Sequence, residues 1–268
     1  MNKGYFQIMI NEFQANLAYK VNLIFRMFSY IIVILIQITI WKALFNGQSE
    51  INSQMGTPIT LLEMTTYVII STCISIVISN QVIDIMENKV KTGEISMDLI
   101  KPINIKLMFL FNTIGSNAFK ILFQLSPLLI VCSVVYKPQL PNIEHFFIFT
   151  LTLLNAFIIY FLLTFIVGLL SFWYMAIWHM KRFLNDLISI LSGSVIPLWF
   201  FPQFLIDLTT FLPFKLIYFL PLSIYLGRLE YMECLMVIIQ QCFWIIILLL
   251  LGKFIWSKGI NKLVIQGG

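Results

Sequence analysis

The chain has 268 residues, of which 60% are hydrophobic and only 11% are charged. Soluble domains carry about 25% charged residues, and they cannot hide many all-apolar segments, because a surface helix needs a polar face. The apolar residues are gathered into runs of about 18–25 residues, long enough to cross a hydrocarbon core of about 30 Å as helices. The composition therefore indicates an integral membrane protein and excludes an ordinary soluble domain.

The formal net charge of +5 does not indicate a nucleic-acid partner. The basic residues flank apolar runs, which is typical of membrane orientation. The four cysteines form no CxxC pair, and the two histidines, His145 and His179, are predicted at opposite ends of helices. Buried small hydrophobes are the simplest interpretation of the cysteines. We therefore expect no metal, no cofactor and no nucleic acid to be bound by this chain.

Residues 3–20 are predicted to form an amphipathic helix. Phe6, Ile10, Phe13 and Leu17 recur at spacings of four, three and four, the period of a helix, with Asn and Gln on the other side. Such a helix can lie in the plane of the membrane interface. The alternative is a polar leader to the first membrane span.

Six membrane-spanning helices are predicted along the rest of the chain. Most are continuous apolar runs, separated by segments that contain charges, proline or glycine. The predicted spans are residues 23–44, 60–83, 107–135, 146–171, 187–198 and 231–255.

Lys and Arg are distributed unevenly between the two sides that six spans define. Twelve fall on the side of the two termini, and four fall on the other side or at its edge. Because cytoplasmic loops carry an excess of Lys and Arg, we expect both termini in the cytoplasm. An odd number of spans would destroy this asymmetry, so the charges support an even number.

Residues 199–229 are apolar and aromatic but too interrupted to form a regular span. Pro202, Pro213 and Pro221 each remove a helix donor and clash with the preceding turn. Unsatisfied backbone groups inside lipid are costly, so we expect two short helices that dip into the outer leaflet. Two further full spans are the alternative.

Residues 84–106 form the largest predicted cytoplasmic connection. Gly93 can end one helix, and Pro102 marks the end of the next element. A short element with an apolar side and acidic neighbours could dock in a groove on a partner, or be an ordinary solvated loop. Periodicity does not distinguish helix from strand here. The residues predicted to dock are Glu94, Ile95, Met97, Asp98, Leu99, Ile100 and Lys101.

No motif predicts an enzyme. A phosphate-binding loop needs GxxxxGK[ST], but Ile247 stands where the first glycine should precede Gly252 and Lys253. Residues 191–194 (LSGS) resemble the start of an ATPase signature, yet they lie in a predicted span. No Ser/His/Asp or paired-carboxylate cluster is visible in the sequence. We therefore expect any ATP hydrolysis to occur on another polypeptide.

Lys120 is the main ionisable residue inside a predicted span. Ion-coupled carriers keep such residues for function, whereas a lysine near a helix end can extend to the headgroups. The shortage of charge within the spans favours an external energy source. A secondary transporter or a channel that is not coupled to ATP is the alternative.

Seven short motifs occur in order along the whole chain, and together they resemble the ABC-2 type permease family, the membrane components of bacterial ABC exporters. Lys101 stands where that family usually has arginine, which keeps the positive charge. The motifs are NLAYK at 16–20, WKALF at 41–45, DLIKPIN at 98–104, LSG at 191–193 with Pro197, LPF at 212–214, Pro221 with YLG at 225–227, and VIQGG at 264–268.

The resemblance implies an all-α transmembrane domain over residues 1–268. Its parts would be an elbow helix at 1–21, a cytoplasmic coupling segment at 84–106 and an extracellular re-entrant segment at 199–229. The elbow residues would be Phe6, Ile10, Phe13, Leu17, Tyr19 and Lys20.

The resemblance also implies partners and a location. Two copies of an ABC ATPase would bind ATP and Mg²⁺, and a second permease, identical or paralogous, would complete the membrane core. The chain would lie in the bacterial plasma membrane, surrounded by lipid. Many aromatic residues and few fixed charges suit export of a hydrophobic or amphipathic substrate, such as a drug, a peptide or a lipid-like molecule.

Overall fold

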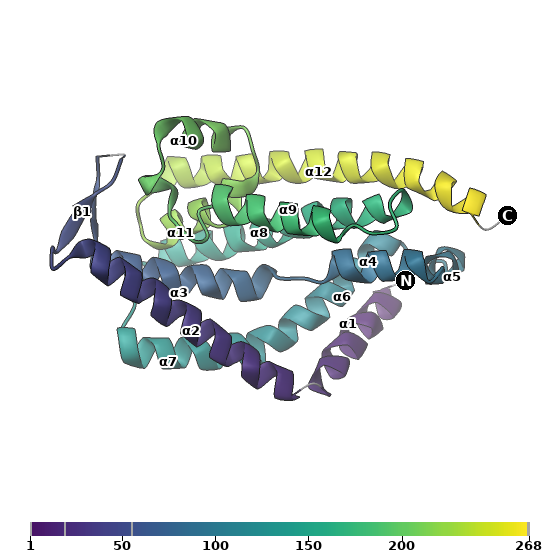
Figure 1. The fold of residues 1–268 in the computed structure, drawn as a ribbon, viewed down its shortest axis with the longest axis horizontal. Helices are drawn as coiled ribbons and strands as arrows, with labels where there is room; N and C mark the ends of the chain where they lie inside the picture. Colours follow the sequence, from purple (N-terminus) through teal and green to yellow (C-terminus); the bar gives the residue numbers. More distant parts are fainter. Residues whose placement is uncertain (1, 19, 55, 267–268) are drawn as a thin grey trace.

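A computed structural model describes residues 2–18, 20–54 and 56–266 as helices packed side by side (Figure 1). Within the described residues, five helical segments are long and apolar enough to cross a membrane, and a pair of short helices bent by 81° makes a sixth if it is taken as one span. The predicted all-helical, multi-pass membrane fold is confirmed at this level. The five segments are Phe25–Phe45, Leu61–Lys91, Ile105–Tyr136, Ile143–Phe172 and Tyr231–Lys262.

The first two helices, α1 (Asn2–Leu17) and α2 (Lys20–Phe45), meet near the bottom of Figure 1. Along α2 the buried side chains recur at helical spacing, while most positions between them are exposed and the majority of those are apolar. A helix that is buried on one side and mainly apolar on the others suits contact with lipid. The buried side chains are Ile34, Ile38, Trp41 and Phe45.

A small antiparallel hairpin of β1 (Glu50–Asn52) and β2 (Pro58–Thr60) follows α2, with Ile51 opposite Ile59. Thr60 then begins α3 (Leu61–Ile78) with a capping box, in which its hydroxyl accepts from the Glu63 N–H and Glu63 accepts from the Thr60 N–H. These two bonds satisfy donors that a helix start leaves free. The hairpin lies at the left end of Figure 1.

Helix α3 is the centre of the bundle. In the most apolar stretch of this span, 72% of the residues are buried. In the matching stretches of α2 and α12 (Tyr231–Gln266) only 22% are buried. The chain breaks at residues 79–81 and continues as α4 (Val82–Lys91), so this membrane segment extends beyond the predicted span 60–83.

The third span contains a π-helical turn. Helix α6 (Ile105–Lys120) passes into η1 (Ile121–Leu125) and then into α7 (Ser126–Tyr136). The Ser126 N–H donates to the carbonyl of Ile121, five residues earlier. Pro127 follows and has no N–H to donate, so the π turn occurs where the regular hydrogen-bond ladder is interrupted.

The predicted fifth span, residues 187–198, is wrong in its limits. Helix α8 (Ile143–Leu169) and the 3₁₀ turn η2 (Leu170–Phe172) lead to α9 (Trp178–Leu191), which already starts in the charged stretch predicted as a loop. Its 14 residues measure about 21 Å, less than the hydrocarbon thickness. Charged residues lie on its outer side, whereas Leu184, Ile188 and Leu191 are buried at helical spacing.

The interrupted segment 199–229 contains two short helices, as predicted. They are α10 (Gln203–Thr210) and α11 (Phe219–Tyr225), and α11 is almost entirely buried. Their depth in a bilayer remains a prediction. The 3₁₀ turns beside them are η3 (Leu198–Phe200) and η4 (Phe214–Leu216).

Candidate functional site

One end of the molecule carries two short helices and the turn between them, which we call the α4–α5 unit (residues 82–100). Helix α5 (Glu94–Ile100) follows Gly93, whose backbone is left-handed (φ 76°), a conformation that most other residues avoid. Lys101 is extended before Pro102, as the proline ring requires. The structure thus confirms both predicted boundaries and shows that the element is a helix rather than a strand.

Asp98 holds the α4–α5 unit together from inside. Its side chain is buried and accepts hydrogen bonds from the ammonium groups of Lys89 on α4 and Lys101 after α5, the latter at 2.7 Å. Burial alone would raise the pKa of Asp98, but the hydrogen bonds and charges of the two lysines outweigh it and lower the pKa below its usual value. An ionised Asp98 therefore ties α5 to α4 at neutral pH.

The residues predicted to dock on a partner are divided between two faces of α5. Ile95 is fully buried with Asp98, three positions later, whereas Met97 is 67% exposed and Ile100 is 85% exposed. Residues three apart share a helix face, so Ile95 faces the interior and Met97 and Ile100 form an outward apolar surface. The expectation that Ile95 and Asp98 belong to the docking side is therefore corrected, because both lie on the inner face of α5. Glu94, Leu99 and Lys101 are also exposed.

The α4–α5 unit contacts the rest of the bundle through α4. Met86 is buried next to Gly168 of α8, where a Cβ atom would lie 3.2 Å from the Met86 side chain. At the surface, Lys181 of α9 lies 2.6 Å from the Asp84 carboxylate. Movement of α5 would therefore reach the bundle through α4.

Helix α1 packs along α6, and the two helices run parallel. The ring of Tyr5 stacks on Phe111 with 5.4 Å between centroids, and Phe13 meets Phe119 edge-on at 5.8 Å. Between these contacts, a Cβ atom on Gly115 would lie only 2.2 Å from the carbonyl oxygen of Met9. Only glycine allows the two helices to approach so closely.

Two polar contacts fix the same seam. The carboxylate of Glu12 accepts a hydrogen bond from the Asn112 amide at 2.7 Å, and the hydroxyl of Tyr5 accepts one from the backbone N–H of Asn104 at 2.8 Å. The contact of Glu12 could not be predicted from the sequence, because a lone acid on a polar helix face gives no indication of a partner.

The predicted apolar side of the N-terminal helix matches this seam only in part. Phe13 lies on it, but Tyr5 is buried in place of Phe6, which is 56% exposed. Ile10 and Leu17 are partly buried. Tyr19 and the side chain of Lys20 lie outside the described residues.

Lys120 fills the break between α3 and α4. Its ammonium group is buried and donates to the Ser79 carbonyl at 2.8 Å, to the Ser79 hydroxyl at 3.1 Å and to the Asn117 side chain at 2.9 Å. Carbonyl groups at a helix end lack intrahelical donors and carry partial negative charge. Lys120 therefore caps α3 and does not extend to the surface, contrary to the interpretation as a lysine that reaches the headgroups.

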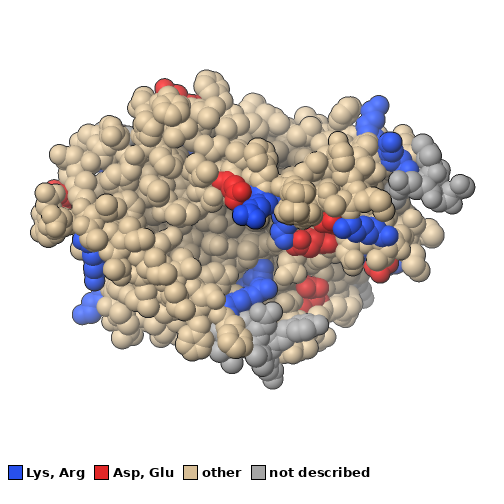
Figure 2. Space-filling view, in the orientation of Figure 1, with Lys and Arg blue, Asp and Glu red and all other residues tan. Residues whose placement is uncertain are grey.

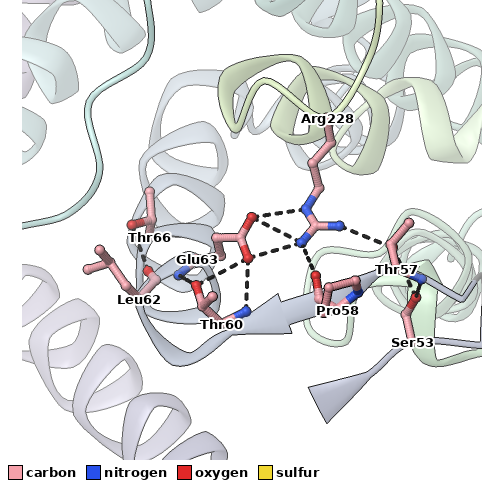
Figure 3. Close-up of polar contacts among 8 residues, drawn as sticks. All are labelled: Ser53, Thr57, Pro58, Thr60, Leu62, Glu63, Thr66 and Arg228. Atoms are coloured by element: carbon pink, nitrogen blue, oxygen red, sulfur yellow. Dashed lines mark hydrogen bonds and ion pairs between the residues drawn. The ribbon is translucent and has the colours of Figure 1, made fainter. Parts of the chain in front are cut away.

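The opposite end of the molecule is fastened by Arg228, which follows α11 (Figure 3). Its guanidinium group contacts both carboxylate oxygens of Glu63 at 3.0 Å, the carbonyl of Pro58 at 2.9 Å and the hydroxyl of Thr57 at 3.2 Å. It also lies 4.8 Å from the ring centre of Trp199. We call this group the Arg228 clamp; it joins the hairpin, α3 and α11.

Comparison with known proteins identifies the family. A comparison with curated sequences finds no match. A family model described as ABC-2 family transporter protein matches residues 31–267, from within α2 to the end of α12. The match includes the α4–α5 unit and the Arg228 clamp, and it does not include α1. This family supplies the membrane component of transporters, normally works with an ATPase subunit and is not enzymatic. The chain, a multi-pass membrane protein by its helices, belongs to the ABC-2 family of transporter proteins.

Proposed function

We propose that the chain is the permease subunit of an ATP-binding cassette exporter and that a separate ATPase drives it through the α4–α5 unit. The observation that carries this proposal is the exposed apolar surface of Met97 and Ile100 on a helix whose other face is anchored. Charged side chains gather around this end of the molecule, as Figure 2 shows over its right half. An apolar helix face with charged surroundings suits a groove on a protein partner.

The proposed mechanism passes the motion of the ATPase to the membrane helices. ATP and Mg²⁺ close two ATPase subunits, and their closure displaces α5. Asp98 couples α5 to α4, and α4 continues from the central helix α3 across residues 79–81. The displacement therefore reaches the middle of the bundle and biases it between inward-open and outward-open states.

The orientation that we propose places the α4–α5 unit and both termini in the cytoplasm of a bacterium. Helix α1 begins and α12 ends at the same end of the molecule as this unit (Figure 1). The excess of Lys and Arg in the corresponding segments supports this orientation. A second permease, identical or paralogous, completes the membrane core, and two ATPase copies bind the pair.

The proposed substrate is hydrophobic or amphipathic and leaves from the cytoplasm or the inner leaflet. A cavity of about 510 Å³ between α2 and the segment after α9 supports this substrate class. Its lining is apolar apart from one amide and carries no charge, so an ion or a sugar would find few partners there. The lining residues include Gln37, Ile40, Trp41, Leu44, Val195 and Phe200.

Site-specific photocrosslinking in membranes of the native host tests the ATPase contact. A photoreactive benzoylphenylalanine is placed at Ile100 in one variant and at Phe211 in the control. Phe211 is 79% exposed but lies in the segment that follows α10, at the opposite end of the molecule. We expect only the probe at Ile100 to link the chain to a protein with an ATPase phosphate-binding loop, identified by mass spectrometry.

A transport assay tests the coupling role of the Met97 and Ile100 surface. Ile100→Asp should abolish ATP-dependent transport in reconstituted vesicles while expression and thermal stability stay unchanged, because the Ile100 side chain is exposed and its replacement should barely affect the stability of the fold. Transport at the normal rate in this variant, or equal crosslinking from both probe positions, would exclude the proposed coupling role. Transport that persists without any nucleotide would favour a secondary transporter or a channel.

A further inference from the structure

A second cavity, of about 540 Å³, lies between α6, α8 and α12, with Leu99 of α5 at its edge. It occurs at the same end of the molecule as the α4–α5 unit, and it is separate from the cavity beside α2. Apolar side chains provide most of its wall. They include Ile105, Phe165, Leu249, Leu250, Trp256 and Ile260.

Two lysines, Lys106 and Lys253, line this cavity. Among the described residues, neither lies within ion-pair distance of a carboxylate. Lys106 belongs to the first turn of α6, where the helix dipole is positive and the Asn104 side chain accepts from the N–H of Leu107. The site thus combines two ammonium groups and a helix start with an apolar wall.

The apolar wall continues onto a surface suited to lipid. Leu250 and Phe254 are each more than 60% exposed on α12, which is one of the two least enclosed spans. A bilayer would cover such a surface with acyl chains. A lipid could therefore enter the cavity from the side, without passing through the bundle.

We propose that this cavity binds one anionic phospholipid of the surrounding bilayer. The phosphate of its headgroup lies next to Lys106, Lys253 and the start of α6, and an acyl chain lies against Phe165 and Trp256. Basic cavities between membrane helices bind anionic headgroups in this way. The proposal requires only that the chain lies in a bilayer, so it can fail or succeed independently of the coupling role of α5.

Lipid retention measured by native mass spectrometry tests the proposal. The full chain is reconstituted in nanodiscs that contain phosphatidylglycerol and phosphatidylcholine in equal amounts and with matched acyl chains. The double variant Lys106→Gln/Lys253→Gln is compared with Lys258→Gln/Lys262→Gln. Both doubles remove two positive charges, but Lys258 and Lys262 do not line the cavity.

We expect the wild type to retain phosphatidylglycerol in preference to phosphatidylcholine. The preference should fall about 5-fold for each cavity lysine that is replaced, and about 30-fold for both, from the usual contribution of a lysine near an anionic lipid surface. The control double should keep the preference of the wild type. An equal loss in both doubles, or no preference in the wild type, would overturn the proposal.

A steric variant tests the cavity with both lysines in place. A Cβ atom on Gly252 would meet Ile166 at an ordinary distance of 3.7 Å, so the backbone accepts a side chain at this position of the cavity wall. Gly252→Leu should displace the lipid and lower its retention, whereas Gly252→Ala should retain it. Undiminished retention in a correctly folded Gly252→Leu, or loss of a co-purifying protein instead of lipid, would contradict a lipid occupant.

Discussion

The two ends of this molecule are held by ion pairs of very different reach. The Arg228 clamp joins residues that are 165 positions apart in the sequence, Glu63 and Arg228. Asp98 instead binds lysines 9 and 3 positions away. The clamp therefore joins distant parts of the fold, whereas the Asp98 pairs join α5 only to its neighbour α4. Contacts of α4 with α8 and α9, among them the Asp84–Lys181 ion pair, fix the α4–α5 unit to the bundle, so a displacement of α5 would be passed on through α4.

The largest expected effect is on the α4–α5 unit itself. Ile95→Asp places a charge at a fully buried position, and it should destabilise the docked state of α5 by about 3–5 kcal/mol. Met97→Asp introduces the same charge on the exposed face and should change that free energy by less than about 0.5 kcal/mol. Hydrogen exchange of the α5 amides measures both values. Similar exchange in the two variants would contradict the division of α5 into two faces.

The second prediction concerns the Arg228 clamp at the opposite end of the molecule. Arg228→Met leaves the partly buried carboxylate of Glu63 without its main partner and should lower global stability by about 2–3 kcal/mol, somewhat below the loss for a fully buried pair. Thermal unfolding in detergent measures the change. Because the clamp joins distant parts of the fold, the midpoint temperature of the whole unfolding transition should fall. The effect of Ile95→Asp should instead be confined to the α4–α5 unit.

A double-mutant cycle isolates the ion pair in the clamp. Glu63→Gln combined with Arg228→Met should destabilise by less than the sum of the two single changes, since the second change then removes no ion pair. Additive effects would show that Arg228 acts through Pro58 and Trp199 rather than through Glu63.

The third prediction tests whether α1 is fixed to the bundle. Gly115→Ala brings a Cβ atom into the backbone of Met9, so the two helices must separate. We expect the packing of α1 against α6 to be destabilised by about 2 kcal/mol. Gly252→Ala is the matched control, because its new Cβ atom meets only an ordinary contact. Protease cleavage near residues 2–17 measures the release of α1. Equal cleavage in both variants would show that the seam is not tightly packed.

The smallest expected effect is that of acid on the Asp98 pair. The pKa of Asp98 is lower in the folded state than in the unfolded state, so its contribution is complete above the unfolded pKa, near 4. It disappears as the pH falls through the folded pKa. Because the lysine partners, Lys89 and Lys101, are partly exposed to solvent, we expect a contribution of only about 1 kcal/mol.

Pepsin, which is active in acid, measures this effect as the rate of cleavage within residues 91–104. Asp98→Asn should be cleaved faster than the wild type at about pH 5, and the two rates should converge as the pH falls through the lowered pKa of the folded Asp98, where its side chain becomes neutral. The ratio of the rates removes the dependence of pepsin itself on pH. A constant ratio over this range would mean that Asp98 does not titrate as the contacts require.

The sequence predicted the long membrane helices well, because hydropathy depends on composition alone. The limits of α9 were missed since Lys181, Arg182 and Asp186 suggested a loop, although Leu184, Ile188 and Leu191 have helical spacing. That spacing could have revealed the helix.

Contacts between distant segments could not be predicted from the sequence. The approach of Gly115 to Met9 and the pairing of Arg228 with Glu63 depend on how separate elements pack, and nothing in either local pattern specifies the partner. Gly93 and Pro102 predicted the limits of α5, whereas the inward position of Ile95 required the helix to be placed against α4. The roles of the α5 and α1 residues in coupling remain predictions.

The seam between α1 and α6 also has a consequence for biosynthesis. Met9 leaves the ribosome about 100 residues before Gly115, an interval of about 5–20 s at usual translation rates. During this interval Tyr5 and Glu12 lack their partners on α6, so we expect α1 to wait at the membrane surface and to dock only after the third span is inserted. Ribosome-arrested chains of increasing length, crosslinked between cysteines placed at Met9 and Ser116, should therefore react only when the nascent chain extends well beyond residue 136.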